Sequence, residues 1–368
     1  MIKVLPLTIV FYFVAMLAPA DAKTVTATYD TFDSVISTVQ GGDTINLVGD
    51  FQLMRTQNYS FSSPVIINAS AATFHRTWTL RDVNNLSIQG GTFDFHPVDA
   101  LYAAALEVYD SNNISVDRTL FTDDGGHDGA LFSSSTNISV TNSKFNSLSH
   151  SIGLKNVDGA NLYNNLTIGT TVDGFDIAGS QNVVASHNSC IDGAPQTGAH
   201  PDCIQIYGIV DGALSSNITL SDNLAFGATQ GFTKFVTGGA GTNISMIRNL
   251  VETTYSQGIA CYDCFASNIS DNLLVTLAAS PHFVNLNIIG GANNTVGGNV
   301  FEDIGRVALY RPVLGSIWHD AGVIPWGAGA LEAGIGLVPE PSVWASLIAG
   351  FAAVGWALRA SRRRLVLA

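Results

Sequence analysis

A short phrase recurs along this chain: an asparagine followed by residues that alternate between apolar and small polar side chains. It begins at Asn85, Asn113, Asn137, Asn161, Asn182, Asn217, Asn243, Asn268 and Asn294. Seven of the eight spacings lie between 21 and 28 residues, and the spacing from Asn182 to Asn217 is 35. Strand-like alternation repeated at this period predicts a solenoid in which each coil contains three short strands.

The residue types explain why such a chain would coil. Apolar side chains point inward from each strand, and successive coils stack about 4.8 Å apart. Asparagine accepts the left-handed backbone of a turn, and its amide can bond the equivalent amide one coil away. A second series of asparagines, which predicts a second turn ladder, stands at Asn142, Asn188, Asn223, Asn249, Asn272 and Asn299. We therefore expect an all-β, single-stranded right-handed parallel β-helix of about nine to eleven coils.

The solenoid domain is predicted to cover residues 23–326. Ser34 to Gln40 reads as a short amphipathic helix that caps the open N-terminal end, and Gly41 to Leu47 reads as the first strand. The repeated phrase fades after about Arg306. The Gly- and Ala-rich residues 327–337 are expected to form a linker.

Residues 1–22 have the features of a secretory signal peptide. Lys3 precedes an apolar stretch from Val4 to Leu17, and the segment ends in the small-x-small sequence from Ala20 to Ala22. Cleavage there would make Lys23 the first residue of the mature chain. An uncleaved anchor helix is the alternative.

The last segment, residues 338–368, joins a Pro-Glu-Pro sequence at Pro339 to an apolar run from Val343 to Leu358 and four arginines after it. This order of parts resembles the PEP-CTERM sorting signal of Gram-negative bacteria. The resemblance implies a transmembrane helix, recognition by an exosortase and delivery to the outer surface or extracellular matrix. The alternative is a plain C-terminal membrane anchor.

The net negative charge of the chain limits the kinds of partner that it is expected to bind. Between Lys23 and Leu337 the chain has 11 basic and 27 acidic side chains. Such a surface repels nucleic acid and anionic lipid, so neither is an expected partner. We expect a monomer.

The four cysteines are Cys190, Cys203, Cys261 and Cys264. An exported protein can form disulfides, and Cys261-x-x-Cys264 lacks the further ligands of a zinc site, so a structural role is favoured over metal or redox work. The pairing stays open, although a Cys190–Cys203 bond would hold His200 against its coil.

The irregular coil is where function is expected in a solenoid. The 35-residue spacing includes an insert between Ile191 and Gln205. If coils stack in register, Asp173 or Asp176 lies within about one or two strand spacings of Asp202. Two close carboxylates and a histidine suit glycosidic-bond cleavage, either by hydrolysis or by elimination. The predicted catalytic residues are Asp173, Asp176, His200 and Asp202.

Other polar residues are predicted to line the same groove and bind substrate: His150, His187, Gln205, Gln230 and Lys234. No cofactor is required by this chemistry, although Ca²⁺ is compatible with it. The acidic run from Asp123 to Asp128 could hold Ca²⁺ or contribute to the groove one or two coils away. It lacks the spacing of a known calcium loop, so an acidic turn is favoured.

The sequence around these residues resembles the pectate-lyase-like superfamily. Thr171-Val-Asp173-Gly-Phe-Asp176 and Asp202-Cys-Ile204 are similar to the Asn-Thr-Asp-Gly and Asp-Asp-Cys-Ile elements of polygalacturonase-type glycosidases. Pro201 replaces the first Asp of the latter, and no Gly-His-Gly element follows. The string from His200 to Gln205 is similar to the His-Pro-Asp-x-Ile-Gln signature of β-helix repeat proteins. The resemblance implies an enzyme that acts on extracellular polysaccharide; the alternative is a non-catalytic scaffold or adhesin that binds glycans.

Overall fold

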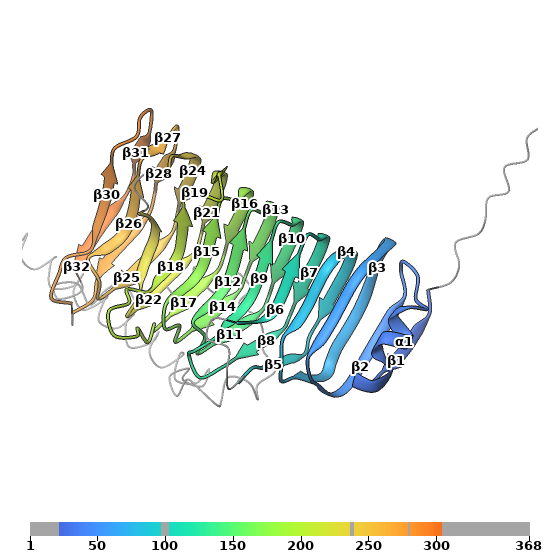
Figure 1. Ribbon diagram of the computed structural model, residues 1–368. Helices are drawn as coiled ribbons and strands as arrows, with labels where there is room; N and C mark the ends of the chain where they lie inside the picture. The colour runs from blue at the N-terminus through green and yellow to red at the C-terminus, as the bar shows by residue number, and fades with distance from the viewer. Residues whose placement is uncertain (1–21, 97–102, 236–238, 279, 304–368) are drawn as a thin grey trace, which may run out of the picture. The chain divides into compact units, whose positions relative to one another are not determined.

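The computed structural model describes residues 22–96, 103–235, 239–278 and 280–303. They form a right-handed parallel β-helix of about 11 turns, which confirms the predicted fold class. Figure 1 shows the coils following one another from the blue N-terminal end to the orange end. Within these ranges no helix is both long enough and apolar enough to cross a membrane. The predicted linker, the sorting tail and nearly all of the signal peptide lie outside the described residues.

Each regular coil contributes one strand to each of three walls, which we number in chain order. Wall 1 contains β6 (Ala104–Tyr109), β9 (Asp128–Ser133), β12 (His150–Lys155), β15 (Asp173–Ala178), β18 (Asp202–Tyr207), β23 (Gln230–Lys234), β26 (Gln257–Tyr262) and β30 (Asn285–Ile289).

Wall 2 contains β7 (Asn112–Asp117), β10 (Thr136–Thr141), β13 (Asp158–Tyr163), β16 (Gln181–Ser186), β21 (Ser216–Ser221), β24 (Gly241–Ile247), β27 (Cys264–Phe265), β28 (Asn268–Ser270) and β31 (Thr295–Gly297). Wall 3 contains β5 (Thr92–Asp94), β8 (Leu120–Thr122), β11 (Lys144–Asn146), β14 (Leu166–Ile168), β17 (Ser189–Ile191), β22 (Leu224–Gly227), β25 (Leu250–Thr253), β29 (Leu273–Thr276) and β32 (Val300–Asp303).

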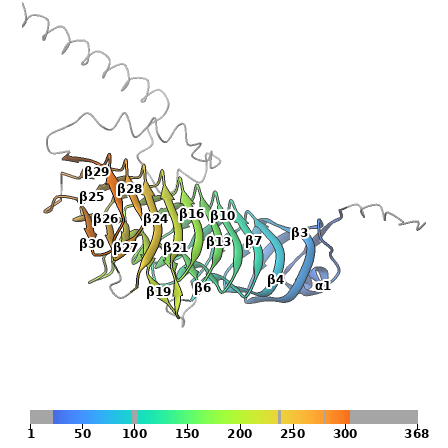
Figure 2. The same cartoon turned by 90° about the horizontal axis from the view of Figure 1, so that it is seen from above.

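The N-terminal coils have longer strands and a helical cap. They comprise β1 (Thr24–Ala27), β2 (Thr44–Phe51), β3 (Met54–Phe74) and β4 (Trp78–Gln89), preceded by the 3₁₀ helix η1 (Tyr29–Thr31) and by α1 (Phe32–Ile36). The predicted cap helix is therefore present, but it begins and ends earlier than expected. Thr31 Oγ1 accepts the Thr28 N–H at 2.9 Å and starts the helical segment there. Figure 2 shows α1 at the N-terminal end of the coils.

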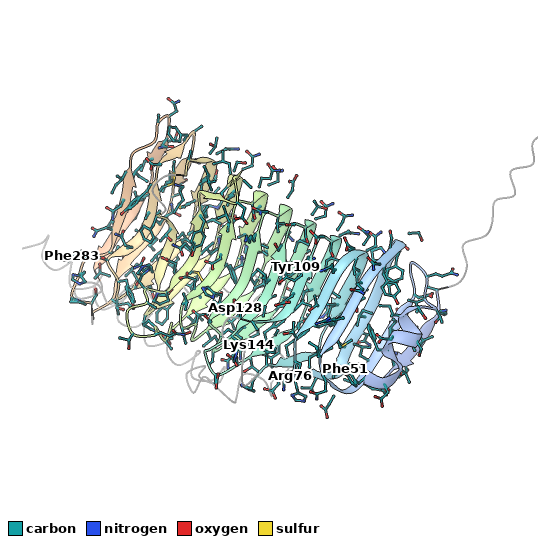
Figure 3. All side chains as sticks on the ribbon, viewed as in Figure 1. Phe51, Arg76, Tyr109, Asp128, Lys144 and Phe283 are labelled. Carbon is teal, nitrogen blue, oxygen red and sulfur yellow. A yellow bond between two sulfur atoms is a disulfide. The ribbon has the colours of Figure 1, made fainter. Side chains whose placement is uncertain are left out.

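The interior is packed with apolar side chains that stack from coil to coil. Phe74, Phe93, Phe121 and Phe145 occupy one inward position on successive coils, with ring centroids 4.4, 4.6 and 4.8 Å apart. Phe32 of α1 is buried and packs edge-on against Trp78 at 5.8 Å, which closes the N-terminal end of this core. Figure 3 shows that side chains cover the outer surface of the coils as well.

Two turn ladders connect the coils. Near the start of the wall 2 strands, the backbone is left-handed at Asn113, Asn137, Asn182, Asn217 and Asn243. A buried ladder runs through Asn165, Asn188, Asn223, Asn249, Asn272 and Asn299, in which each Nδ2 donates to the Oδ1 of the next residue at 2.8–3.0 Å. Asn142, predicted to belong to this second ladder, instead occupies the half-buried turn position beside it, with a left-handed backbone.

Candidate active site on wall 1

The strands of wall 1 begin with a row of polar residues. The row contains Asp128, His150, Asp173, Asp202 and Gln230 at the same register position on β9, β12, β15, β18 and β23. A second outward row runs through Gly153, Asp176, Gln205 and Thr233. The predicted stacking in register therefore brings Asp173, Asp176 and Asp202 onto one wall.

His150 is held between two carboxylates. Its Nδ1 lies 2.8 Å from Asp128 Oδ1, and its Nε2 lies 3.6 Å from Asp176 Oδ2. His150, Asp173 and Asp176 each bring one side-chain atom into a group whose members lie within 4.8 Å of one another. His150 was predicted as a substrate ligand, and it lies at the centre of the cluster. The sequence places Asp128 in an acidic turn that could also contribute to the groove, and in the structure Asp128 orients this imidazole.

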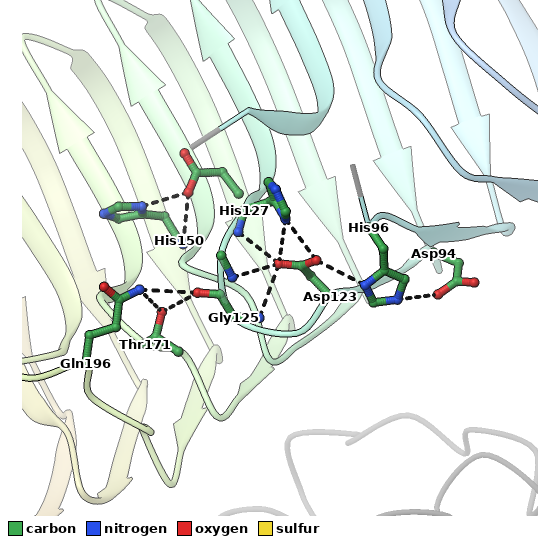
Figure 4. A network of polar contacts seen from close by, with 10 residues as sticks. Asp94, His96, Asp123, Gly125, His127, His150, Thr171 and Gln196 are labelled. Carbon is green, nitrogen blue, oxygen red and sulfur yellow. Dashed lines mark hydrogen bonds and ion pairs between the residues drawn. The ribbon is translucent and has the colours of Figure 1, made fainter. Parts of the chain in front are cut away.

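Asp202 is enclosed by the insert that precedes it. Its side chain is fully buried, and His200 Nδ1 lies 3.7 Å from its Oδ2. His200 itself is 60% exposed at the end of the insert. The Cys190–Cys203 disulfide closes the insert, as the sequence allowed. Gln196 also fixes it, because Nε2 donates to Thr171 Oγ1 at 3.0 Å (Figure 4).

A pocket of about 330 Å³ lies beside the carboxylates. Gly153, Ala178 and Tyr207 are among the residues that line it. The hairpin of β19 (Ile209–Val210) and β20 (Ala213–Leu214) supplies Val210 to the lining. The 35-residue coil thus contains two insertions, the predicted one and this hairpin.

The tip of the hairpin is fastened to wall 1 two coils earlier. Lys155 Nζ lies 2.9 Å from Asp211 Oδ2. Because β12 also carries His150, this ion pair links the hairpin to the strand that supplies the imidazole. Sequence reasoning missed the hairpin; the paired turn signal Asp211-Gly212 between two apolar pairs was the available clue.

Burial and mutual repulsion raise the pKa values of the carboxyl groups. Burial raises the pKa of Asp176 to about 8, with the Asp173 charge adding to the rise. Burial likewise raises the pKa of Asp202 to about 7, and it raises the pKa of Asp173. These carboxyl groups therefore retain protons far above the ordinary range of an aspartate.

The pKa values of the two histidines are also raised, but here nearby carboxylates raise them and burial acts to lower them. The Asp202 carboxylate raises the pKa of His200 to about 9, against a smaller effect of burial. At His150 burial acts to lower the pKa, but the hydrogen bond with Asp128 and the charge of Asp176 together raise it to about 9. Both imidazoles are cationic at neutral pH.

The remaining predicted substrate residues divide into two groups. Gln205 aligns with Asp176, and Gln230 aligns with Asp202, so both adjoin the cluster. His187 has a left-handed backbone in the turn between walls 2 and 3 and is not among the residues that line the wall 1 pocket.

Lys234 is also misassigned by the sequence. It is fully buried at an inward position of β23, in register with the buried Cys261. Its ammonium donates to the main-chain oxygens of Gly239 and Tyr262. Because the side chain is inside the solenoid, it does not line the groove. Lysine can reach from such a position to polar groups at the coil edge through its long stem.

The acidic run before β9 forms a turn. Asp123 accepts the main-chain N–H groups of Gly125, Gly126 and His127 at 3.2, 2.9 and 2.8 Å. His127 and His96 contact the same carboxylate, as Figure 4 shows. The favoured interpretation as an acidic turn agrees with this satisfied carboxylate. Cys261 and Cys264 form a disulfide, in agreement with a structural role.

Fold and site together define a right-handed parallel β-helix with an acidic, histidine-containing pocket on one wall. Residues 79–245 match the family model for the right-handed β-helix region. No curated protein sequence matches the chain significantly.

Solved structures with a TM-score of 0.50 or more show the same fold at low sequence identity. An alginate lyase from Paenibacillus sp. str. FPU-7 is 15% identical with a TM-score of 0.54, over 74% of this chain and 99% of that one. An endo-xylogalacturonan hydrolase from Aspergillus tubingensis is 12% identical with a TM-score of 0.50, over 76% and 93%. The surface adhesin PfbA of Streptococcus pneumoniae is 12% identical with a TM-score of 0.45, over 74% and 86%.

Proposed function

We propose that this protein acts on an extracellular polysaccharide that lies along wall 1, and that the wall 1 cluster cleaves its glycosidic bonds. The observation that carries the proposal is the convergence of His150, Asp173 and Asp176, with Asp202 in register on the next strand. His150 and Asp176 line the adjacent pocket together with Tyr207. Buried carboxylates without cationic side-chain partners other than histidine are costly to a fold, so their retention on one wall favours a chemical role.

The residues divide naturally into two roles. His200, cationic at neutral pH and largely exposed, is suited to donate a proton to the leaving glycosidic oxygen, with Asp202 behind it as the positioning residue. The group of His150, Asp173 and Asp176 faces the other side of the bond. There the carboxylate of Asp176, ionised above its raised pKa of about 8, activates a water in hydrolysis or removes a sugar proton in elimination.

The fold is compatible with either reaction. The two better-matching structures are named as a lyase and a hydrolase, so the likeness supports polysaccharide as the substrate class without choosing the bond chemistry. Gln205 and Gln230 adjoin the cluster and are suited to bind sugar hydroxyls. The signal peptide and the PEP-CTERM-like tail support export and processing by an exosortase at the surface of a Gram-negative cell.

A glycan-binding scaffold without catalysis is the second candidate. It is favoured by one specific contact, because Asp173 Oδ1 accepts the Asp202 main-chain N–H at 2.7 Å, which is a structural use of a proposed catalytic carboxylate. The two functions differ in whether product forms.

The test is to incubate the purified chain with a polysaccharide panel, with and without Ca²⁺. Reducing ends report hydrolysis, and the ultraviolet absorbance of an unsaturated sugar reports elimination. We expect product that is lost in Asp202→Asn and retained in Asp33→Asn, an exposed aspartate of α1. Binding without product would support the scaffold, and product in both variants would remove Asp202 from the mechanism.

A further inference from the structure

One group of side chains on wall 1 has the composition of a metal site. His150 offers an imidazole nitrogen, and Asp173 and Asp176 each offer a carboxylate oxygen, all within 4.8 Å of one another. The residues come from β12 and β15, which are adjacent and paired in register. The backbone of two hydrogen-bonded strands therefore fixes their spacing.

The contacts behind these three residues are those expected of ligands. His150 Nδ1 is 2.8 Å from Asp128 Oδ1, which leaves Nε2 directed at Asp176. A carboxylate behind a histidine is the common arrangement around protein-bound metals, because it fixes the ring and raises its basicity. Asp173 is fixed in the same way by the main-chain N–H of Asp202 at 2.7 Å.

Unused acceptor capacity also points toward a cation. Asp176 Oδ1 is inaccessible to solvent and has no hydrogen-bond donor among the described residues. Asp202, one coil further along the row, is fully buried with both carboxylate oxygens in the same condition. Buried carboxylate oxygens normally accept hydrogen bonds, and the contacts of Asp176 with His150 at 3.6 Å and of Asp202 with His200 at 3.7 Å are too long to supply them. Carboxylates in this condition favour a further cation beside them.

We propose that His150, Asp173 and Asp176 bind a divalent first-row transition metal ion of the Zn²⁺ or Mn²⁺ type. An imidazole ligand favours these ions over Ca²⁺ and Mg²⁺, which prefer oxygen alone. Binding displaces the proton from His150 Nε2, because only the neutral ring has a lone pair for the ion. Three protein ligands leave the ion an open position, and His150 and Asp176 also line the pocket. The site goes beyond the proposed cleavage, because the ion would bind whether or not polysaccharide is present.

The test titrates the chelator-treated full chain with Zn²⁺ or Mn²⁺, using calorimetry for stoichiometry and the Mn²⁺ paramagnetic resonance signal for the bound ion. We expect one saturable site that is lost in His150→Ala and in Asp176→Asn. Asp128→Asn should weaken binding by about 10- to 100-fold, since it removes only the residue behind the imidazole. Ca²⁺ should bind far more weakly.

Two further variants serve as controls. His187→Ala removes an imidazole from the turn between walls 2 and 3 and should leave binding unchanged. His96→Ala tests the other His–Asp group, where His96 lies beside Asp123 and Asp124. Binding that survives His150→Ala in folded protein, or no saturable Zn²⁺ or Mn²⁺ binding, overturns the proposal. Metal binding without polysaccharide cleavage leaves it intact and contradicts only the proposed function.

Discussion

Asp173 and Asp202 are joined by a hydrogen bond across 29 residues of sequence: Asp173 Oδ1 accepts the main-chain N–H of Asp202 at 2.7 Å. The bond links two successive coils at the start of their wall 1 strands. It sets the position of Asp202 relative to the carboxylates of the preceding coil. One side chain thus contributes both to coil register and to the charge of the pocket.

Because Asp173 has both roles, two substitutions of it should differ in their effect on stability. Asp173→Asn retains an acceptor for the Asp202 N–H, so we expect near-normal stability with loss of cleavage. Asp173→Ala leaves that buried N–H without a partner and should cost about 1–3 kcal/mol in the free energy of unfolding. Denaturant unfolding and the cleavage assay distinguish them. Equal stability of the two variants would show that the hydrogen bond contributes little.

The pH dependence of cleavage should follow the His200–Asp202 pair. Burial raises the pKa of Asp202 to about 7, and Asp202 raises the pKa of His200 to about 9. Between these values Asp202 is ionised and His200 is protonated, so a bell-shaped profile with limbs near both is expected.

The sign of each limb follows from the protonated form required. Activity falls below about pH 7 as Asp202 gains a proton, and above about pH 9 as His200 loses one. The stability due to the raised His200 pKa is likewise complete below its ordinary value of about 6.5 and is lost as the pH rises through the folded value. In Asp202→Asn, the residual cleavage measured at high protein concentration should show the alkaline limb displaced downward, because the charge that raises the pKa of His200 is gone. An unchanged limb would exclude His200 as the proton donor.

The buried ladder is expected to dominate the stability of the turns. Asn223 Nδ2 donates to Asn249 Oδ1 and to the Ala185 oxygen, and its Oδ1 accepts from Asn188. Asn223→Ala breaks these bonds inside the protein and should cost about 2–4 kcal/mol.

The matched control lies in the exposed ladder of the same coil. Asn217→Gly keeps a residue suited to the left-handed backbone at φ 54° and loses only exposed bonds, so its cost should stay below about 1 kcal/mol. Thermal and denaturant unfolding measure both. A similar cost for the two variants would mean that burial does not set the strength of the ladder.

The sequence predicted the solenoid because the strand phrase repeats, but it did not fix the register of every coil. The structure aligns Gly159, Ala266 and Asn293 with the turn asparagines, each with a left-handed backbone, where the phrase had selected Asn161, Asn268 and Asn294. Glycine serves the same turn without an asparagine, and the asparagine two residues later then imitates the motif.

The part of the site that the sequence predicts is the part that follows from register between neighbouring coils. Asp173, Asp176 and Asp202 are brought together because their strands pair without a shift. Lys234 was misjudged because its position on β23 is inward, and a charged residue at such a position is not expected from its type. Asp128 required the three-dimensional register, since its partner His150 is 22 residues away.

The lining of the pocket offers a final test that leaves the carboxylates untouched. Gly153 lies on β12 between Leu131 and Asp176 of the neighbouring coils and forms part of the pocket. A Cβ at Gly153 would approach Leu131 Cδ1 at 3.1 Å, a contact that a flexible side chain can relieve. We therefore expect Gly153→Ala to fold normally while it reduces the space for a sugar ring, which raises KM more than it lowers kcat.

The contrasting variant is Gly174→Ala, one strand further along. A Cβ there would lie 2.4 Å from the main-chain oxygen of Cys203, which cannot move without shifting β18. Because that shift displaces Asp202 relative to Asp173, we expect losses in both stability and kcat. Unfolding curves and initial rates over a range of polysaccharide concentrations separate the two cases. If Gly153→Ala leaves KM unchanged, the sugar does not occupy the pocket on wall 1, and the substrate path must lie elsewhere on the coils.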